Sequence, residues 1–339
     1  MRTNSNAMIG FISWYRSDPF PGGSLNPRPP IPRSIVPVAL ALAFLFAGCS
    51  RGRTEAQSQP APPPSVTYLS SWGVRGNGPG QLSQPACIAT DSVGDTYIVD
   101  AASHFVEKFD PRGTPLLAFE EDGLKHPQAI TVDSGGAIYV TDSGRNSATI
   151  FLPSGDRYRE LRLRTRQNLE NMIDVAVEDD GTIHVLDTGA GKMFTFTSRL
   201  RLLRSWSPEA DQPSVKVRPK AVASGADGFL YVADPASNRI LRFTGDGRFL
   251  TALNATSDGT DRRLSDRIAV SRGYIFAMDV DGRMLHVFTT EGRPVLDTDL
   301  AADLGQAKRS APALAASPRK ELLVLDSPGA RVLRYQLNF

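Results

Sequence analysis

Cysteine and histidine are scarce in this sequence, and so is any excess of one charge. The 339 residues include two cysteines, Cys49 and Cys87, and four histidines. Two cysteines cannot build a disulfide framework or a CxxC metal site. Lysine and arginine total 38 against 36 aspartates and glutamates. General nucleic-acid binders carry a marked excess of basic side chains, so a nucleic acid is not an expected partner.

The longest apolar run, residues 35–48, is too short to span a membrane comfortably, which takes about 20 residues, but it suits the core of a signal peptide. Residues 45–49, Leu-Phe-Ala-Gly-Cys, resemble the lipobox of bacterial lipoproteins. The resemblance implies cleavage before Cys49 and a lipid on its thiol. We therefore expect residues 1–48 to be a signal peptide and the protein to be anchored in the cell envelope, at the outer membrane. A plain signal peptide or an uncleaved anchor is the alternative.

Residues 49–65 are rich in Pro, Ser and Gln and contain almost no apolar side chains. Such a segment cannot bury enough apolar surface to order itself. We expect it to be a flexible tether between the lipid and a folded domain.

From residue 66 to residue 339 the sequence repeats. Six similar segments end in an aspartate, at spacings of 42 to 47 residues. A glycine lies six residues before five of these aspartates, with Lys320 in the sixth copy, and an aromatic residue lies nine residues after each. The repeated aspartates are Asp100, Asp142, Asp187, Asp234, Asp279 and Asp326.

Each repeat predicts four short antiparallel strands, because apolar residues alternate with a period of two and glycine recurs at the turns. Four strands in about 45 residues are typical of a β-propeller blade. The sixth repeat lacks a fourth strand, and one unmatched strand, residues 66–72, precedes the first repeat. We predict an all-β, six-bladed β-propeller over residues 66–339, whose N-terminal strand completes the last blade and removes two exposed sheet edges.

The repeats resemble the NHL-repeat family, over about residues 66–339. The resemblance rests on Ser-Trp-Gly at 71–73 with the following Gly-Pro-Gly-Gln-Leu at 78–82, on Thr-Tyr-Ile-Val-Asp at 96–100 and on Asp-Gly-Phe-Leu-Tyr-Val-Ala-Asp at 227–234. It implies a propeller fold and says little about function.

Candidate sites are few. Aspartates repeated once per blade lie too far apart to converge, so we expect each to cap its own loop. Some propellers of this kind, the peptidyl-hydroxyglycine amidating lyases, bind zinc through three histidines from different blades. Here only His126 precedes an innermost strand, and one ligand cannot form such a site. We expect no metal, no cofactor and no catalytic residue, and we expect Cys87 to pack in the interior.

Two groups of residues remain as candidate binding surfaces. The first is the rim, formed by the loops after the second strand and before the first strand of each blade: His104, His126, Arg145, Asn146, Asn238, Arg239, Arg283 and Arg331. The second is a run of arginines along an outer strand, which protects that edge from pairing or binds an anionic partner: Arg159, Arg162, Arg164 and Arg166.

These observations favour a monomeric, lipid-anchored propeller that binds a protein, peptide or glycan partner without catalysis. Two alternatives stay open. One is a lyase or hydrolase acting at the mouth of the central channel. The other is a purely structural component of the envelope.

Overall fold

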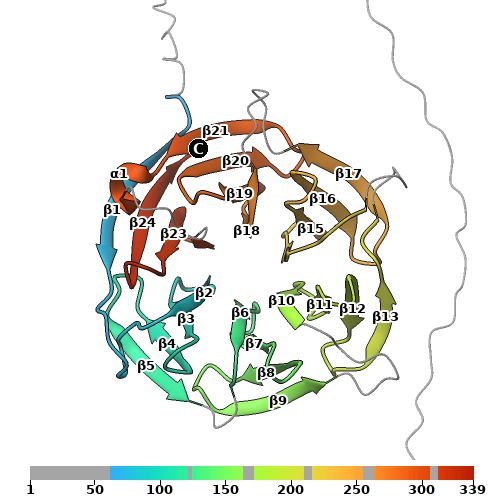
Figure 1. Ribbon diagram of the computed structural model, residues 1–339, viewed down its shortest axis with the longest axis horizontal. Coiled ribbons are helices and arrows are strands. Elements are labelled where there is room, and N and C mark those ends of the chain that lie inside the picture. Colours follow the sequence, from blue (N-terminus) through green and yellow to red (C-terminus); the bar gives the residue numbers. More distant parts are fainter. Residues whose placement is uncertain (1–61, 121–123, 163–171, 210–215, 255–262, 306–311) are drawn as a thin grey trace, which may run out of the picture. The chain divides into compact units, whose positions relative to one another are not determined.

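The computed structural model describes residues 62–120, 124–162, 172–209, 216–254, 263–305 and 312–339. They form six four-stranded antiparallel sheets around a central channel, as Figure 1 shows. The prediction of a six-bladed propeller is confirmed. The single helix among these residues, α1 (Ala301–Leu304), has four residues. None of the described helices has the length and apolar character that crossing a membrane requires.

In blades 1–5 the strands follow the chain from the channel outward, and in blade 6 the first strand of the chain takes the outermost place. Blade 1 consists of β2 (Pro85–Thr90), β3 (Thr96–Asp100), β4 (Phe105–Phe109) and β5 (Pro115–Glu120). Blade 2 consists of β6 (Pro127–Val132), β7 (Ile138–Asp142), β8 (Ser147–Phe151) and β9 (Arg157–Arg162). Blade 3 consists of β10 (Met172–Val177), β11 (Ile183–Asp187), β12 (Lys192–Phe196) and β13 (Leu202–Trp206).

The second half of the ring repeats this order. Blade 4 consists of β14 (Ala221–Ser224), β15 (Phe229–Asp234), β16 (Arg239–Thr244) and β17 (Phe249–Asn254). Blade 5 consists of β18 (Leu264–Ser271), β19 (Tyr274–Asp279), β20 (Met284–Thr289) and β21 (Pro294–Asp299). Blade 6 consists of β22 (Ala313–Ser317), β23 (Glu321–Asp326), β24 (Arg331–Asn338) and β1 (Ser65–Trp72).

Ring closure follows the prediction: β1 is the outer strand of blade 6. It pairs antiparallel with β24 from Ser65, opposite Asn338, to Trp72, opposite Val332. The Trp72 ring also packs against Phe109 of blade 1, with ring centroids 4.7 Å apart. The N-terminal strand thus connects the last blade to the first.

Positive φ angles persist at the turns even where the repeat has lost its glycine. Gly136, in the turn after β6, has φ 84°. In the corresponding turn of blade 6, Lys320 has φ 59°. A side chain in this region costs roughly 1–2 kcal/mol. The surrounding hairpin therefore imposes the conformation, and the glycine only makes it easier.

The repeated aspartates cap loops, as expected. The carboxylate of Asp142 accepts hydrogen bonds from the backbone N–H groups of Lys125, His126 and Gly144 at 2.5–3.0 Å. Asp142 thereby joins the loop before the first strand to the loop after the second. The six aspartates are at most 5% exposed. Their carboxylates bond to backbone N–H groups and to side chains of nearby loops, and they do not converge on one point, so the six aspartates do not share a catalytic role.

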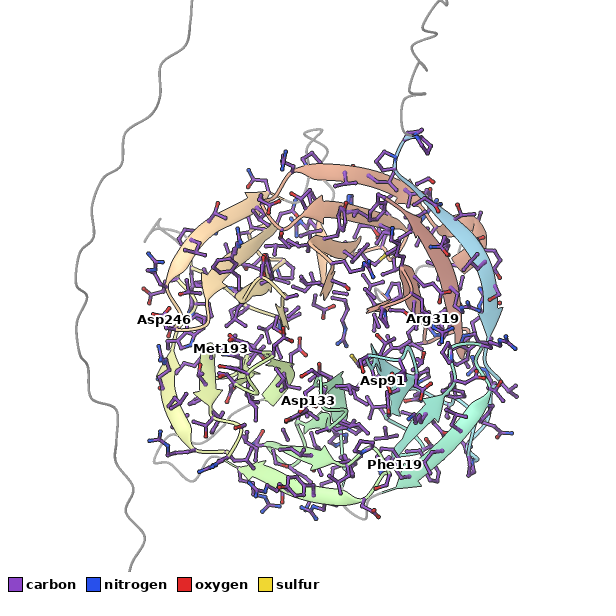
Figure 2. All side chains as sticks on the ribbon, turned by 180° about the vertical axis from the view of Figure 1, so that it is seen from behind. Asp91, Phe119, Asp133, Met193, Asp246 and Arg319 are labelled. Carbon is purple, nitrogen blue, oxygen red and sulfur yellow. The ribbon has the colours of Figure 1, made fainter. Side chains whose placement is uncertain are left out.

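A second polar pair recurs at the opposite end of blades 1–4. The hydroxyl of Tyr139 donates to Asp133 at 2.9 Å, and the same arrangement joins Tyr97 to Asp91 and Tyr231 to Asp227. In blade 3 a histidine and a glutamate replace the pair, with His184 Nε2 2.8 Å from Glu178 Oε1. Because His184 takes the place of the tyrosine in this pair, it is a structural residue. Asp91 and Asp133 lie beside the central opening in Figure 2.

Glu107, in β4, is a buried carboxyl that the repeat does not explain. Its side chain is fully buried, and its Oε2 atom accepts a hydrogen bond from the Gly80 N–H at 2.8 Å. Its Oε1 atom has no partner among the described residues. Burial raises the pKa of Glu107 to about 7, while the Gly80 N–H acts in the opposite direction. The folded protein therefore holds this proton up to neutral pH.

The Glu107 carboxyl should make stability depend on pH. As the pH rises from 4.5 to 7, the unfolded chain ionises while the folded chain keeps the proton, so the wild type loses up to about 3 kcal/mol. Glu107→Gln removes this loss and should gain stability relative to the wild type between pH 4.5 and pH 8. Urea unfolding at both pH values measures the difference, with the exposed Glu209→Gln as control. An equal effect of Glu107→Gln at the two pH values would contradict the assignment.

Candidate functional site

The six innermost strands, β2, β6, β10, β14, β18 and β22, enclose the central channel, which has a cavity volume of about 170 Å³. Small and aliphatic side chains make up most of its wall. Three lining residues carry reactive groups at one level: Cys87, Asp174 and Arg267. We refer to these three residues as the channel triad.

Strand register shows that the triad shares one level. Cys87 pairs with Val99 and Asp174 pairs with Leu186, each partner being the residue just before a repeated aspartate. Arg267 precedes Ile268, which pairs with the residue two before Asp279. The triad therefore occupies equivalent positions in blades 1, 3 and 5.

Alanines hold the same position in blades 2, 4 and 6. Ala129, Ala221 and Ala313 each pair with the residue before the repeated aspartate. A methyl group projects little into the channel. The alternation leaves room between the three larger side chains, which face one another across the channel.

Asp174 is held in place by the backbone of two blades. Its Oδ1 atom accepts the N–H of Val175 at 2.9 Å, and its Oδ2 atom accepts the N–H of Val222 in β14 at 2.9 Å. Its remaining exposed surface faces the channel, which is itself enclosed by protein. Burial therefore raises the pKa of Asp174 to about 6, although the Val222 N–H and the charge of Arg267 act in the opposite direction. This carboxyl is mainly ionised at neutral pH and is a stronger base than an exposed aspartate.

Arg267 supplies positive charge at the same level. Burial opposes the guanidinium charge, while Cys87 and nearby carboxyl groups favour it, and the pKa of Arg267 is raised. The arginine therefore stays charged. A charged guanidinium in an enclosed channel can bind a carboxylate or a carbonyl oxygen and stabilise negative charge that forms on it.

Cys87 meets the sequence-based expectation only in part. Cys87 packs against the core clusters, as expected, but it is only half-buried because it also lines the channel. Burial raises the pKa of its thiol. Since the thiolate is the nucleophilic form, Cys87 is a poor nucleophile at neutral pH.

The predicted rim residues lie at the end of the blades that is nearer to the triad, because the triad lies near the start of the innermost strands. Most bond to nearby loops, either their own or that of a neighbouring blade. Asn238 accepts the Leu264 N–H at 2.7 Å, and Arg331 binds Asp326 at 2.9 Å. His104 and Asn146 adopt positive φ angles of 65° and 48°. The rim residues do not gather into one cluster.

The remaining rim residues follow the same pattern. Arg239 donates to Ser237 at 2.9 Å, and Arg283 lies 3.4 Å from Asp299. His126 is exposed, and its backbone N–H donates to Asp142. The Arg145 backbone N–H donates to the Asp142 carbonyl at 3.2 Å. These contacts maintain loop shape.

The predicted arginine patch is partly self-neutralised where it is described. Arg162 lies 2.6 Å from Glu160, and Arg159 lies over the ring of Tyr158 with its guanidinium 4.8 Å from the ring centroid. Arg164 and Arg166 fall outside the described residues, as does Cys49.

Neither a metal cluster nor a histidine appears at the triad within the described ranges. No group of three or more His, Cys, Asp and Glu side chains there is placed to hold a metal ion. His286 is buried in blade 5, with its Nδ1 atom 2.8 Å from Asp297. The acid–base capacity of the channel thus resides in Asp174.

Sequence analysis overlooked Asp174 and Arg267. Asp174 stands 13 residues before its repeated aspartate, where blades 2, 4 and 6 have alanine. A charged residue at a position otherwise held by alanine was a visible signal. Arg267 is harder to find, because the same count in blade 5 selects Asp266. In that blade Ile275 pairs with Val270, so the first turn is one residue shorter than in the other blades.

No protein-family model matches the chain, and no curated protein matches it. The NHL assignment therefore remains a resemblance. Solved structures do match. A streptogramin B lyase aligns with a TM-score of 0.60 at 14% identity, over 80% of this chain and 98% of the other.

Two further structures are of virginiamycin B lyase from Staphylococcus aureus. The selenomethionine form aligns with a TM-score of 0.57 at 12% identity, over 81% of this chain and 99% of that one. A catalytically inactive histidine-to-alanine variant with quinupristin aligns with a TM-score of 0.56 at 15% identity, over 81% and 88%. At these identities the likeness establishes the fold.

These matches correct the expected function. We expected a non-catalytic module that binds a protein, peptide or glycan, but the three propellers are described as lyases. The alternative of a lyase or hydrolase at the channel mouth stays open. The raised pKa of Asp174, at the same level of the channel as the charged Arg267, is compatible with that alternative.

Proposed function

We propose that this protein is a lyase that acts on a small molecule at the mouth of its channel, with Asp174 as the general base and Arg267 as the anion-stabilising group. The observation that carries the proposal is the Asp174 carboxyl, whose pKa is about 6 and which shares one level of the channel with Arg267. Bases with a pKa near the working pH are the effective ones in enzymes.

The reaction consistent with this pair is an elimination next to a carbonyl group. The Asp174 carboxylate takes a proton from the carbon beside the carbonyl, and the C–H electron pair becomes part of a new C=C bond. The leaving group departs from the next carbon with its own bonding pair and collects a proton from solvent. Arg267 binds the carbonyl oxygen and stabilises the negative charge that develops there.

The size of the channel limits what enters it. A volume of about 170 Å³ admits the reacting end of a substrate but not a large molecule. The rest of the substrate would lie on the rim. Cys87 stays protonated at the channel wall and shapes this space without forming a bond.

The proposed mechanism differs from that of the structural neighbour whose histidine-to-alanine variant is inactive. The described part of this channel has no histidine, so the base is assigned to a carboxylate. The substrate class named for the neighbours, the streptogramin B compounds, is the first to test because the fold is shared.

The test is turnover of quinupristin by the purified protein, followed by mass spectrometry. Elimination should consume quinupristin and yield material whose total mass equals that of the substrate, because no water is added. Product heavier by one water would make the enzyme a hydrolase. Cys87 reacts slowly with a maleimide because its thiol stays mainly protonated, and it serves as a built-in reporter because bound quinupristin should slow this alkylation further. No consumption together with no protection of Cys87 would refute the proposal.

The location of the enzyme is a separate proposal. The lipobox-like end of the leader supports lipid attachment at Cys49 and residence in the cell envelope, with residues 49–65 as the tether. The mass of the N-terminal peptide of the purified protein decides this, because an unmodified Cys49 would exclude a lipid anchor.

A further inference from the structure

A second cavity lies between blades 5 and 6, at the end of the blades away from the rim. Its volume is about 200 Å³. Its apolar lining comes from Tyr274 and Phe276 of β19, from Leu337 of β24 and from Phe339, which follows β24. The Tyr274 and Phe339 rings meet edge to face, with centroids 4.6 Å apart. The cavity therefore has an apolar, aromatic interior.

The entrance to this cavity is basic. Arg272 and Lys320, both exposed, line it together with the hydroxyl groups of Ser271 and Ser317. None of the described lining residues is acidic. The Nη1 atom of Arg272 donates to the Pro318 carbonyl at 3.0 Å, and the guanidinium has further donors for another group.

The cavity lies where the sixfold pattern breaks. In blades 1–4 the first turn supplies a carboxylate that pairs with a tyrosine or histidine of the second strand. In blades 5 and 6 apolar residues, Phe276 and Leu323, hold that second-strand position. Their turns carry Arg272 and Lys320 at positive φ. The first turns of blades 5 and 6 therefore lack the carboxylate of blades 1–4 and carry two cations, Arg272 and Lys320, in its stead.

We propose that this cavity binds a small aromatic carboxylate. Its volume exceeds the roughly 150 Å³ of a cavity that holds benzene, so one ring fits with a short polar group. The edges of Tyr274 and Phe339 suit an aromatic ring, and the two cations at the entrance suit a carboxylate. Ala316 lines both this cavity and the channel, but none of the triad residues lines this cavity, so the inference does not depend on the proposed reaction.

The test is isothermal titration of the full chain with benzoate, compared with neutral benzamide and with acetate. Benzoate should bind at least about tenfold more tightly than either, because benzamide lacks the carboxylate charge and acetate lacks the aromatic ring. The double variant Arg272→Gln, Lys320→Gln should lose about tenfold or more in benzoate affinity. Arg319→Gln is the matched control: Arg319 is an exposed cation on the same turn as Lys320 and is labelled in Figure 2, but it does not line the cavity.

The outcomes are distinct. Selective benzoate binding that falls in the double variant and not in Arg319→Gln would support the proposal. Equal affinity for benzoate and benzamide, or benzoate binding that the double variant leaves unchanged, would overturn it. Because both substituted side chains are exposed, the double variant should keep the wild-type melting temperature, and a circular-dichroism melt checks that it is folded. Maleimide alkylation of Cys87 should not respond to benzoate, which separates this cavity from the channel.

Discussion

Replacing Asp174 with asparagine is expected to lower kcat/KM for elimination by about 10²- to 10⁴-fold, the usual contribution of a general base. The amide keeps the size of the side chain but cannot take a proton. Replacing Arg267 with glutamine should cost about 10²-fold or more, because the developing negative charge loses its charged donor. Asp179→Asn, at an exposed aspartate in the first turn of blade 3 that does not line the channel, should leave kcat/KM within about twofold of the wild type.

The pH profile distinguishes a base from a structural carboxylate. Since the base must be ionised, wild-type kcat/KM should rise with pH through about 6, the pKa of Asp174, and level off above it. That step should be missing in any residual activity of Asp174→Asn.

If Asp174 only ties β10 to β14, the outcome differs. Asp174→Asn would then lower the melting temperature, while kcat/KM per folded molecule would stay near the wild-type value and keep its pH profile. The wild-type profile can be measured even if the variant folds poorly, so the assignment remains testable.

Removing β1 is expected to destabilise the propeller more than any single substitution. A chain that starts at Gly73 loses the pairing of β1 with β24 and the packing of Trp72 on Phe109. Backbone hydrogen bonds contribute about 1 kcal/mol each, and the half-buried Trp72 contributes part of the roughly 3–5 kcal/mol of a fully buried tryptophan, so the loss should reach at least about 5 kcal/mol. In a domain of this size the melting temperature should fall by about 10 °C or more.

A chain that starts at Ser65 keeps β1 and is the matched control. A synthetic peptide of residues 65–72, SVTYLSSW, should restore part of the lost melting temperature when added to the shortened chain. The same peptide with alanine in place of Trp72 should restore less. Full stability of the shortened chain without peptide would mean that ring closure does not depend on β1.

The fold could be predicted from the repeat because each hairpin is determined by residues close together in the sequence. Each hairpin needs alternating apolar residues and a turn that tolerates positive φ, and both recur in every copy. Where the glycine is replaced by Lys320, the neighbouring strands still impose the conformation. The unmatched strand of residues 66–72 could be assigned by counting, because a four-stranded blade with three strands needs one more. Structure confirmed it as β1 opposite β24.

The site could not be derived in this way. Cys87, Asp174 and Arg267 come from three separate blades, and they share a level only because each innermost strand has a particular register. A change of one residue in the length of a turn shifts the register between the two strands that it joins, so a different side chain reaches a given level of the channel. In blade 5 the shorter first turn places Arg267, not Asp266, at the level of Asp174.

The amino-acid sequence thus sufficed for the six blades, their strand order and the capping role of the repeated aspartates, since these depend on contacts between residues close together in the chain or on a period that can be counted. Ring closure in space brought the triad to one level of the channel and opened the aromatic cavity between blades 5 and 6. Both depend on contacts between residues far apart in the chain, and the environment that raises the pKa of Asp174 exists only once the blades enclose it.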